Sequence, residues 1–488
     1  MIPSARLRLL NSLPIQSDRA FVLYWMTAFR RTSYNFALQH AVDLANELKK
    51  PLVVLEALRC HYRWASDRFH RFVIDGMMDN ARAVRDASTT YVSYVEPHSG
   101  HGSGLIEALS QHACVVVSDD FPCYFHPAMY SLVARHLHCR IELVDSNTIV
   151  PMRWADRTFT VAHSYRRYMQ KIIYEAIPEF PLENPLKVLK AKQFADIPKV
   201  IQSRWGISVN EKAIDKLQKI RLSDLPLDHA VAVTSDRGGE IAARSLLKTF
   251  VSKKLSRYSL DRNEPEKIGS SNLSAYLHFG QISPHEVFME IAEASRWNAT
   301  KLGKPNGKMD GFWNMGENAE AFLDQLMTWR EIGFNMCCRE RHYLRYESLP
   351  DWALTTLEEH ASDERPYIYT LNEFEESKTH DPLWNAAQQQ LVREGRIHNY
   401  LRMLWGKKIL HWSRTPQDAL QIMIELNNKY ALDGRDPNSY SGIFWVLGRY
   451  DRAWGPERSI FGKVRYMTSE STQNKWATKN YIAKYSPA

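Results

Sequence analysis

Short apolar runs alternate with stretches of helical periodicity over the first 150 residues. The runs have the length of β-strands and are rich in Val, Leu and Tyr; they cover residues 21–26, 51–58, 89–96, 114–120 and 140–146. Between the first two runs, residues 34–50 place apolar side chains at helical spacing. This βαβ rhythm predicts a parallel sheet covered by helices. The topology of such sheets places a ligand crevice at the carboxyl ends of the strands.

A second pattern follows residues 177–198, where repeated prolines interrupt any long helix. Beyond them strand signals fade and helical spacing dominates, over residues 240–255, 284–294, 319–338, 381–412 and 416–430. We therefore predict an α/β, Rossmann-like domain at residues 1–150, an interdomain connection at 151–200, and a mostly α-helical domain at 201–488.

The composition is that of an ordinary globular protein with a large core, because 44% of the 488 residues are hydrophobic and 24% are charged. The net charge of +8 favours a polyanionic partner such as nucleic acid, although many basic enzymes never bind DNA. No stretch has the pattern of a membrane-spanning helix or a secretory signal. We therefore expect a cytoplasmic protein, associated with the nucleoid in a prokaryote.

Two common kinds of site are disfavoured. No G-x-G-x-x-G motif follows a strand, and the glycines of SGHGSG at residues 99–104 have the wrong spacing for a nicotinamide site. The six cysteines form no C-x-x-C pair, and Cys337 and Cys338 are adjacent, which suits neither zinc nor an iron–sulfur cluster. We therefore predict no metal site.

A candidate phosphate cradle begins at Arg257 and Tyr258 and ends in GSSNLS at residues 269–274. The second part has the composition of a helix start, where Ser or Asn caps free backbone N–H groups. Such a helix end also binds phosphate, because its donors and its dipole both favour an anion. Taken alone, the segment is more simply a capped helix.

Three tryptophans of the helical part, Trp384, Trp405 and Trp412, suggest an electron-transfer path. Trp405 and Trp412 are seven residues apart, which puts them on one helix face about 10 Å apart along the axis. A redox path needs oxidisable rings at short distances between a buried cofactor and the surface, although core packing gives the same spacing. Beside Trp405, a buried Arg402 would need an anionic partner, for which Asp433 is the candidate; an ordinary core salt bridge fits as well.

Several segments together resemble the photolyase/cryptochrome family, most closely the class II cyclobutane pyrimidine dimer photolyases. They are VLYWM at residues 22–26, ANELKKPLVV at 45–54, SNLSAYLHFGQIS at 271–283, THDPLWNAAQ at 379–388, YALDGRDPNSYSGIFW at 430–445, DRAWG at 451–455 and FGKVRYM at 461–467. The resemblance spans nearly the whole chain and is densest after residue 237.

The resemblance implies roles for individual residues. The diphosphate of FAD would be held by Tyr258, Ser270, Ser271, Asn272, Leu273 and Ser274, and its isoalloxazine ring by Asn399, Arg402, Asn427, Asp433 and Arg435, with Asn427 near flavin N5. Electrons would pass along Trp405, Trp384 and Trp412, in that order outward from the flavin. Trp329 and Trp445 would embrace a dimer flipped out of DNA, Gln325 and Met403 would touch it, and Arg262 and Arg465 would contact DNA.

The implied activity is light-driven repair of cyclobutane pyrimidine dimers. Photoexcited reduced FAD gives an electron to the dimer, the cyclobutane ring opens, and the electron returns. Flipping is least costly for a base that is already damaged, and Trp329 and Trp445 would each add ~1–3 kcal/mol of stacking. In this family the N-terminal domain can carry a folate or deazaflavin antenna, whose contacts the sequence does not assign. We expect a monomer.

Three residues depart from the class II pattern. Gln325 stands where the class has a glutamate that bonds the dimer; an amide both donates and accepts, whereas a carboxylate only accepts. Photolyases for six-four photoproducts carry glutamine there, which keeps that lesion as an alternative substrate. Leu404 replaces a tyrosine and Asn399 a glycine, which suggests a divergent branch.

Two further alternatives are a cryptochrome-like photoreceptor and a flavoprotein without a role on DNA. The short segment after Arg465 leaves little room for the C-terminal extension of a receptor, and Trp329 and Trp445 suit a substrate pocket better than a sensor. The basic charge and the pocket arginines count against the flavoprotein without a DNA role.

Overall fold

The computed structural model describes residues 2–487, which form two compact units. Unit 1 extends to Trp154 and adds Ile173–Lys248 and Leu273–Glu290, whereas unit 2 comprises Ala155–Ile172, Thr249–Asn272 and the chain from Ile291 onward. Three helices contain a boundary: α5 (Ala162–Ala176), α8 (Glu240–Lys253) and α11 (Pro284–Ala294). The chain therefore passes between the units several times.

Unit 1 is built on a seven-stranded sheet with the order β1-β6-β5-β2-β3-β4-β7. The strands are β1 (Leu7–Leu9), β2 (Phe21–Met26), β3 (Leu52–Leu58), β4 (Thr90–Val95), β5 (Ala113–Asp119), β6 (Arg140–Val144) and β7 (Ser208–Val209). The five central strands are parallel, with Tyr24 paired to Val54 on one side and to Val117 on the other, which confirms the predicted sheet. The antiparallel edge strands β1 and β7 were not predicted, because two or three residues show no period.

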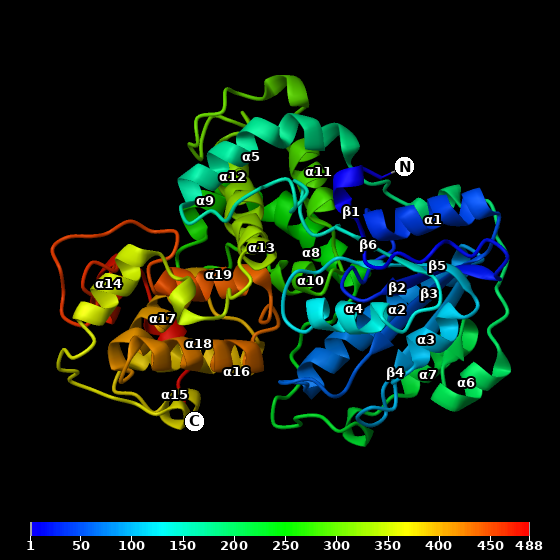
Figure 1. Ribbon diagram of the computed structural model, residues 1–488. Helices are drawn as coiled ribbons and strands as arrows, with labels where there is room; N and C mark the ends of the chain where they lie inside the picture. Colours follow the sequence, from blue (N-terminus) through cyan, green and yellow to red (C-terminus); the bar gives the residue numbers. More distant parts are fainter. Residues whose placement is uncertain (1, 488) are drawn as a thin grey trace. The chain divides into compact units, whose positions relative to one another are not determined.

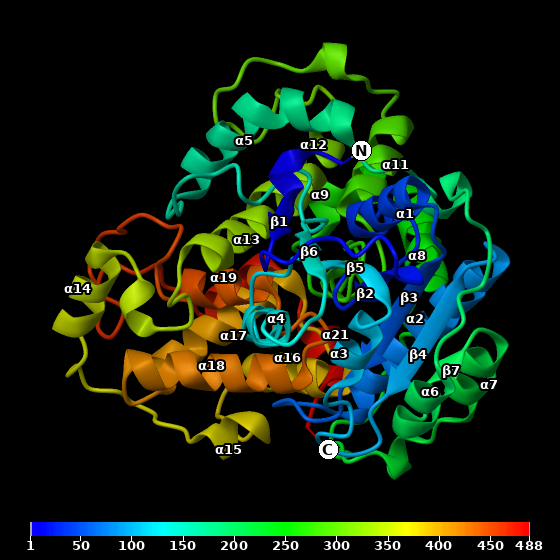
Figure 2. The ribbon, with the colours of Figure 1, turned by 45° about the vertical axis from the view of Figure 1, so that its right-hand side comes forward.

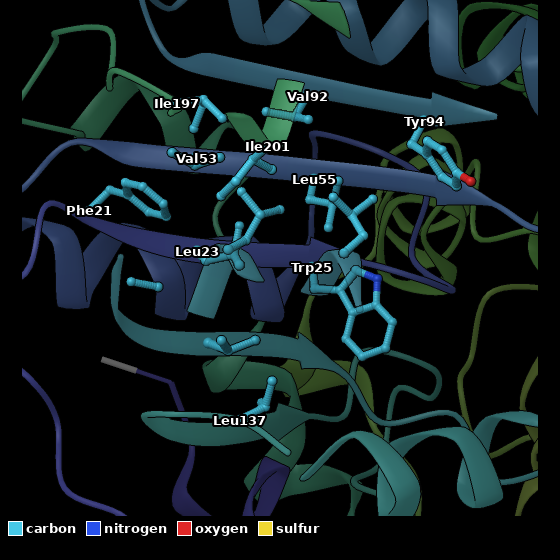
Figure 3. Packing of buried hydrophobic residues seen from close by; sticks show 14 of the residues in the cluster. Phe21, Leu23, Trp25, Val53, Leu55, Val92, Tyr94, Leu137, Ile197 and Ile201 are labelled. Atoms are coloured by element: carbon cyan, nitrogen blue, oxygen red, sulfur yellow. The ribbon is translucent and has the colours of Figure 1, made fainter. Parts of the chain in front are cut away.

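Helices cover both faces of this sheet (Figure 2). One face packs against α1 (Phe36–Leu48) and α2 (Asp67–Asp86), and α7 (Glu211–Lys219) packs on α2. The other face packs against α3 (Leu105–Ser110), α4 (His126–Ala134) and α6 (Lys199–Trp205). Figure 3 shows the buried cluster on this second face, to which β2 contributes alternate residues, Phe21, Leu23 and Trp25. Burial of both faces explains why the strands are apolar throughout.

Unit 2 is helical (Figure 1). Its helices are α9 (Tyr258–Asp261), α12 (Glu317–Leu323), α13 (Arg330–Arg339), α14 (Asp351–Glu359), α15 (Leu371–Glu375), α16 (Pro382–Glu394), α17 (Asn399–Trp412), α18 (Pro416–Tyr430), α19 (Pro437–Val446), α20 (Ser469–Lys475) and α21 (Lys479–Lys484). α17 packs against α16, α18 and α19, and α13 packs against α19. Helices α16, α18 and α19 each begin with a proline after an N-cap whose side chain accepts backbone N–H groups, Asp381, Thr415 and Asp436.

Two of the predicted helices are interrupted. Residues 381–412 form α16 and α17, because Gly395 ends α16 in the left-handed region at φ +68°. Residues 319–338 contain a π-helical turn, Asp324–Trp329, between α12 and α13. Both interruptions lie next to predicted site residues.

Residues 2–487 contain neither a membrane-spanning helix nor a metal-binding cluster. No helix in this range is long and apolar enough to cross a membrane, and no group of three His, Cys, Asp or Glu side chains in it is arranged to hold a metal ion. The architecture is the predicted one, an α/β part with a mainly parallel sheet and a helical part.

Candidate active site

The π-helical turn Asp324–Trp329 carries two predicted lesion-binding residues, Gln325 and Trp329. Such turns recur at functional sites, because they move side chains out of the α-helical register. The buried Asp324 carboxylate accepts hydrogen bonds from Arg166 at 2.6 and 3.1 Å and from the Trp329 indole N–H at 3.0 Å. Asp324 and Arg166 therefore fix the Trp329 ring. The sequence did not reveal this pairing, since the two residues are 158 positions apart.

Gln325 faces Arg262. With the amide turned so that its oxygen faces the guanidinium, the orientation that suits both groups, Gln325 accepts from the two terminal nitrogens of Arg262 at 3.2 and 3.3 Å. Its amide N–H groups are then left for another partner. The guanidinium also lies over the Tyr258 ring, 5.4 Å from the centroid, and the buried Nε of Arg262 has no hydrogen-bond partner. Burial raises the pKa of the Tyr258 hydroxyl, while the Arg262 charge opposes that shift. One predicted FAD residue thus lies beside two predicted substrate residues.

Trp329 and Trp445 stack directly on each other, with ring centroids 4.3 Å apart and an interplanar angle of 16°. The stack follows from close packing of α13 on α19, where a Cβ on Gly333 would lie 2.5 Å from the Pro437 carbonyl oxygen. No space separates the rings in this arrangement, and their role of embracing a dimer stays a prediction. A dimer must lie against an outer face of the pair or part the rings.

The helices around α17 bring one predicted pair together. Arg402 donates to both carboxylate oxygens of Asp433 at 2.9 and 3.2 Å, and the pair is half-buried. The buried Asn427 donates from Nδ2 to the Ser439 hydroxyl at 2.6 Å. Arg435 is also buried, at φ +60°, and its guanidinium donates to carbonyls at the end of α18. The Arg402–Asp433 pair confirms the contact, and the roles toward FAD stay predictions.

Three more predicted residues lie on α17 or after α19. Asn399 is exposed at the start of α17, and Met403 is half-buried one turn further on. Arg465 is exposed, and its guanidinium lies 5.5 Å from the centroid of the Trp454 ring. Arg452 lies over the same ring at 4.9 Å. We had not singled out Trp454, although an aromatic residue beside an arginine in DRAWG is a visible signal for nucleic-acid contact.

The predicted phosphate cradle has no side-chain cap. α10 (Ser274–His278) has five residues, and its N-cap is Leu273, whose side chain cannot accept a hydrogen bond. The prediction of a Ser or Asn cap is wrong, because the Ser270 hydroxyl donates instead to Asn272 Oδ1 at 2.8 Å. Asn272 has φ +58°, and a Cβ on Gly269 would meet the main chain of α9 at 2.6 Å. Contact of this tight turn with the FAD diphosphate stays a prediction.

Trp384, Trp405 and Trp412 meet in the interior of unit 2. The Trp384 indole donates to the Trp405 carbonyl at 3.0 Å, and the Trp384 and Trp412 rings lie 6.1 Å apart between centroids. The Trp405 indole donates to Gln388 at 2.9 Å. Trp384 thus contacts both of the other tryptophans, and electron transfer along the three stays a prediction.

The last of these rings does not reach solvent, since Trp412 is only 1% exposed. The Tyr369 ring lies 5.7 Å from it and the exposed His380 ring 4.9 Å, and these two side chains share a 2.7 Å hydrogen bond. Lys408 Nζ lies 5.0 Å over the Trp412 ring. A path that ends at the surface would therefore need a group beyond Trp412.

In unit 1 a buried carboxylate lies at the point where the topology predicts a crevice. The strand order reverses between β2 and β5, where Asp119 accepts from the backbone N–H groups of Thr27, Ala28 and Phe29 at 2.7–2.8 Å and from the Tyr24 hydroxyl at 2.7 Å. The Asp119 carboxylate is fully buried; burial raises its pKa, and these donors oppose the shift. The protein's own carboxylate therefore occupies the place of an anion at this point, and a ligand crevice along the carboxyl ends of the strands stays a prediction.

Comparison with known proteins identifies the family. No family model matches the chain. The chain is 34% identical over 483 residues to a deoxyribodipyrimidine photo-lyase of Methanothermobacter thermautotrophicus, which covers 99% of this chain and 98% of that protein. The chain therefore belongs to the photolyase/cryptochrome family. Photolyases of the same name from Potorous tridactylus and Arabidopsis thaliana are 31% and 30% identical, over 99% of this chain and 85% and 92% of their own lengths.

A solved photolyase shares the fold. The crystal structure of a bacterial class III photolyase from Agrobacterium tumefaciens matches with a TM-score of 0.65 over 97% of this chain and 87% of that chain. At 17% identity this likeness concerns the fold. The photolyase fold thus accounts for both units, and the site residues must be argued from the chain itself.

Proposed function

We propose that this chain is a photolyase that uses light to split cyclobutane pyrimidine dimers in DNA, with FAD as its cofactor. The observation that carries the proposal is the 34% identity to a deoxyribodipyrimidine photo-lyase over nearly the full length of both proteins. The resemblance to class II enzymes is the finer part of the proposal. The contacts of unit 2 support it in three ways: groups suited to FAD, a surface suited to the dimer, and buried aromatic rings suited to electron supply.

Unit 2 has buried polar groups that suit a bound flavin. His398 Nδ1 is buried without a hydrogen-bond partner, which is costly unless a ligand satisfies it. Burial lowers the pKa of His398 to about 4, so its ring is neutral at pH 7. Tyr258, Arg402, Asn427 and Asp433 would hold and orient FAD, and reduced FAD, when bound, supplies the light-driven electron.

The dimer would rest on the segment around the π-helical turn. Because Arg262 holds the Gln325 carbonyl, the amide N–H groups of Gln325 remain to donate to a pyrimidine carbonyl. The stacked pair Trp329–Trp445 offers a half-buried aromatic face, worth ~1–3 kcal/mol to a flipped base. Arg465 would bind phosphate without reading sequence.

The buried tryptophans would return flavin to its reduced form. Trp384, Trp405 and Trp412 are all at most 3% exposed and adjoin one another through the contacts of Trp384. Exclusion of water and dense packing hold oxidisable rings at fixed short distances. The chain's own contribution to this step is therefore geometry.

An antenna chromophore has a suitable surface in unit 1. The segments after β3 and β5 bring together half-buried aromatic rings, with Trp64 stacked 5.9 Å from Tyr124 and Tyr62 lying 6.0 Å from Phe125. Arg63 lies 4.5 Å from the Trp64 ring. Flat conjugated rings such as a folate or deazaflavin stack on such surfaces. Trp64→Ala should reduce energy transfer from an added folate or deazaflavin to FAD. Unchanged energy transfer in this variant would mean that the antenna binds elsewhere.

The deciding experiment is a blue-light repair assay with chemically reduced, FAD-loaded protein. One oligonucleotide carries a cyclobutane thymine dimer and a second carries a six-four photoproduct. Splitting of the first alone is the expected result. Splitting of the second alone would assign the protein to the other lesion, and failure on both with intact flavin photoreduction would favour a photoreceptor.

A further inference from the structure

Lys407 is a fully buried lysine on α17, the helix that also carries Trp405 and Trp412. Its Nζ donates one hydrogen bond, to the Val446 carbonyl oxygen at 2.5 Å. No carboxylate among residues 2–487 forms an ion pair with it. A buried ammonium with one neutral acceptor is expensive to maintain, so its position calls for an explanation.

The acceptor lies at the end of α19. Val446 is the last residue of this helix, and the preceding carbonyls of Phe444 and Trp445 accept backbone N–H groups of residues 447–449 at 3.0–3.1 Å. Lys407 donates to the next carbonyl along the chain, that of Val446. The C-terminal end of a helix favours a positive charge, because its unpaired carbonyls and its dipole are negative there. Lys407 therefore caps α19 from α17.

Gly406 lets the two helices approach closely at the same place. A Cβ on Gly406 would lie 2.6 Å from Val446 Cγ2 and 3.2 Å from Met423 Sδ. The contact adjoins Trp405 on one helix and Trp445 on the other. Along the sequence, Gly406 is therefore one residue from Trp405 of the proposed electron path, and Val446 is one residue from Trp445 of the proposed lesion surface.

Two charged groups act on Lys407, both on the segment after α19. Asp451 favours its protonation and Arg465 opposes it, and burial lowers the pKa of Lys407 to about 7. Within residues 2–487, helices α16, α18 and α19 add no further charge that acts on it. Arg465 is exposed, so a phosphate bound there would offset the positive charge that opposes protonation.

We propose that Lys407 is a positioning residue that takes up a proton from solvent when DNA binds at Arg465, and that the charged form fixes the end of α19 beside Trp445. The inference rests on the proposed function, because DNA phosphate is the trigger. An ammonium binds a carbonyl and a helix end more strongly than a neutral amine does. DNA binding and the geometry of the lesion surface are coupled through this one contact.

The test is calorimetric titration of FAD-loaded protein with a duplex that carries one cyclobutane dimer. Measurement in two buffers of different ionisation enthalpy gives the number of protons taken up. We expect uptake of about half a proton at pH 7, almost none at pH 6, and roughly threefold weaker binding at pH 8 than at pH 7. Lys407→Met should abolish this uptake and pH dependence. Lys429→Met removes a lysine of α18 that pairs with Glu375 of α15, and it should leave the proton uptake and the pH dependence unchanged.

Equal proton uptake in wild type and Lys407→Met would overturn the inference. Arg465→Gln tests the inference with Lys407 in place. Binding of DNA should weaken, and the proton uptake should vanish because the positive charge that opposes protonation of Lys407 is already absent. Uptake that persists in Arg465→Gln would equally overturn the inference. Absence of dimer-specific binding in every variant would instead contradict the proposed function.

Discussion

Buried hydrogen-bond donors gather in the loop after β2 in unit 1 and around Arg262 in unit 2. The two groups differ in whether the protein supplies an acceptor for every donor. In unit 1, Asp119 accepts from three backbone N–H groups and from Tyr24, so every donor of the group has its acceptor within the protein. In unit 2, Arg262 bonds the neutral carbonyl of Gln325, and its Nε stays without a partner.

The difference separates groups that stabilise the fold from groups that await a ligand. A buried donor without a partner costs free energy in the free protein and regains it when a ligand supplies the acceptor. The filled site should therefore matter for stability alone, and the open one for binding. Substitutions at Asp119, Arg262 and Gln325 test this difference.

The largest effect on stability is expected from Asp119→Ala. Removal of the carboxylate leaves three buried N–H groups and the Tyr24 hydroxyl without an acceptor, which should lower the free energy of unfolding by about 3–5 kcal/mol. Urea denaturation measures the change. A loss below about 1 kcal/mol would show that water or a rearranged loop replaces the carboxylate, and the contrast would fail.

Trp405→Phe should slow photoreduction of oxidised FAD by roughly tenfold or more, because phenylalanine is much harder to oxidise. Repair by chemically reduced protein should be unaffected. Flash photolysis follows the first process and the oligonucleotide assay the second. Trp205→Phe is the matched control, a buried tryptophan in the core of unit 1. Unchanged photoreduction in Trp405→Phe would remove Trp405 from the electron path.

Arg262→Met should weaken binding of dimer-containing DNA roughly tenfold, by about 1.4 kcal/mol, without lowering the free energy of unfolding. The substitution removes an unpartnered buried Nε as well as the hydrogen bonds to Gln325. Fluorescence anisotropy and urea denaturation measure the two quantities on one preparation. Arg85→Met, at a surface arginine of unit 1, supplies the baseline. Loss of stability with intact affinity would reverse the assignment of the open site.

Gln325→Glu should have the smallest effect. It gives Arg262 the anionic partner that Asp119 provides in unit 1, so we expect the free energy of unfolding to rise by less than about 1 kcal/mol. Repair of the cyclobutane dimer should be kept or raised, since the carboxylate can accept a hydrogen bond from a pyrimidine N–H in place of the one that the Gln325 amide would donate. Complete loss of that repair would mean that the pocket is built for another lesion.

Long-range periodicity predicted the fold well, and local exceptions to it were missed. Five parallel strands and the helical part follow from spacing alone, and the pairing of Arg402 with Asp433 follows from the need of a half-buried guanidinium for an anion. The break at Gly395 had a visible signal, a glycine before Arg396 within a helical pattern.

Other features depend on tertiary contacts that no local pattern encodes. Asp119 reaches the backbone after β2 only because β2 and β5 are neighbours in the sheet, and the Trp329–Trp445 stack exists because Gly333 lets α13 and α19 approach. The same holds for Lys407, whose partner lies on another helix. Spacing names the residues of such sites, and packing decides what they touch.

The π-helical turn also constrains how this chain can change length over evolution. A π turn holds one residue more than an α-helix needs, so deletion of one residue within Asp324–Trp329 would restore a regular helix. The wider turn takes up the extra residue locally, so the helix on either side would keep its register while the side chains within the turn changed direction. Gln325 would then point away from Arg262 while every amino acid of the pocket was still present. Insertions and deletions should therefore be excluded from this stretch, and chimeras that exchange it must keep its length.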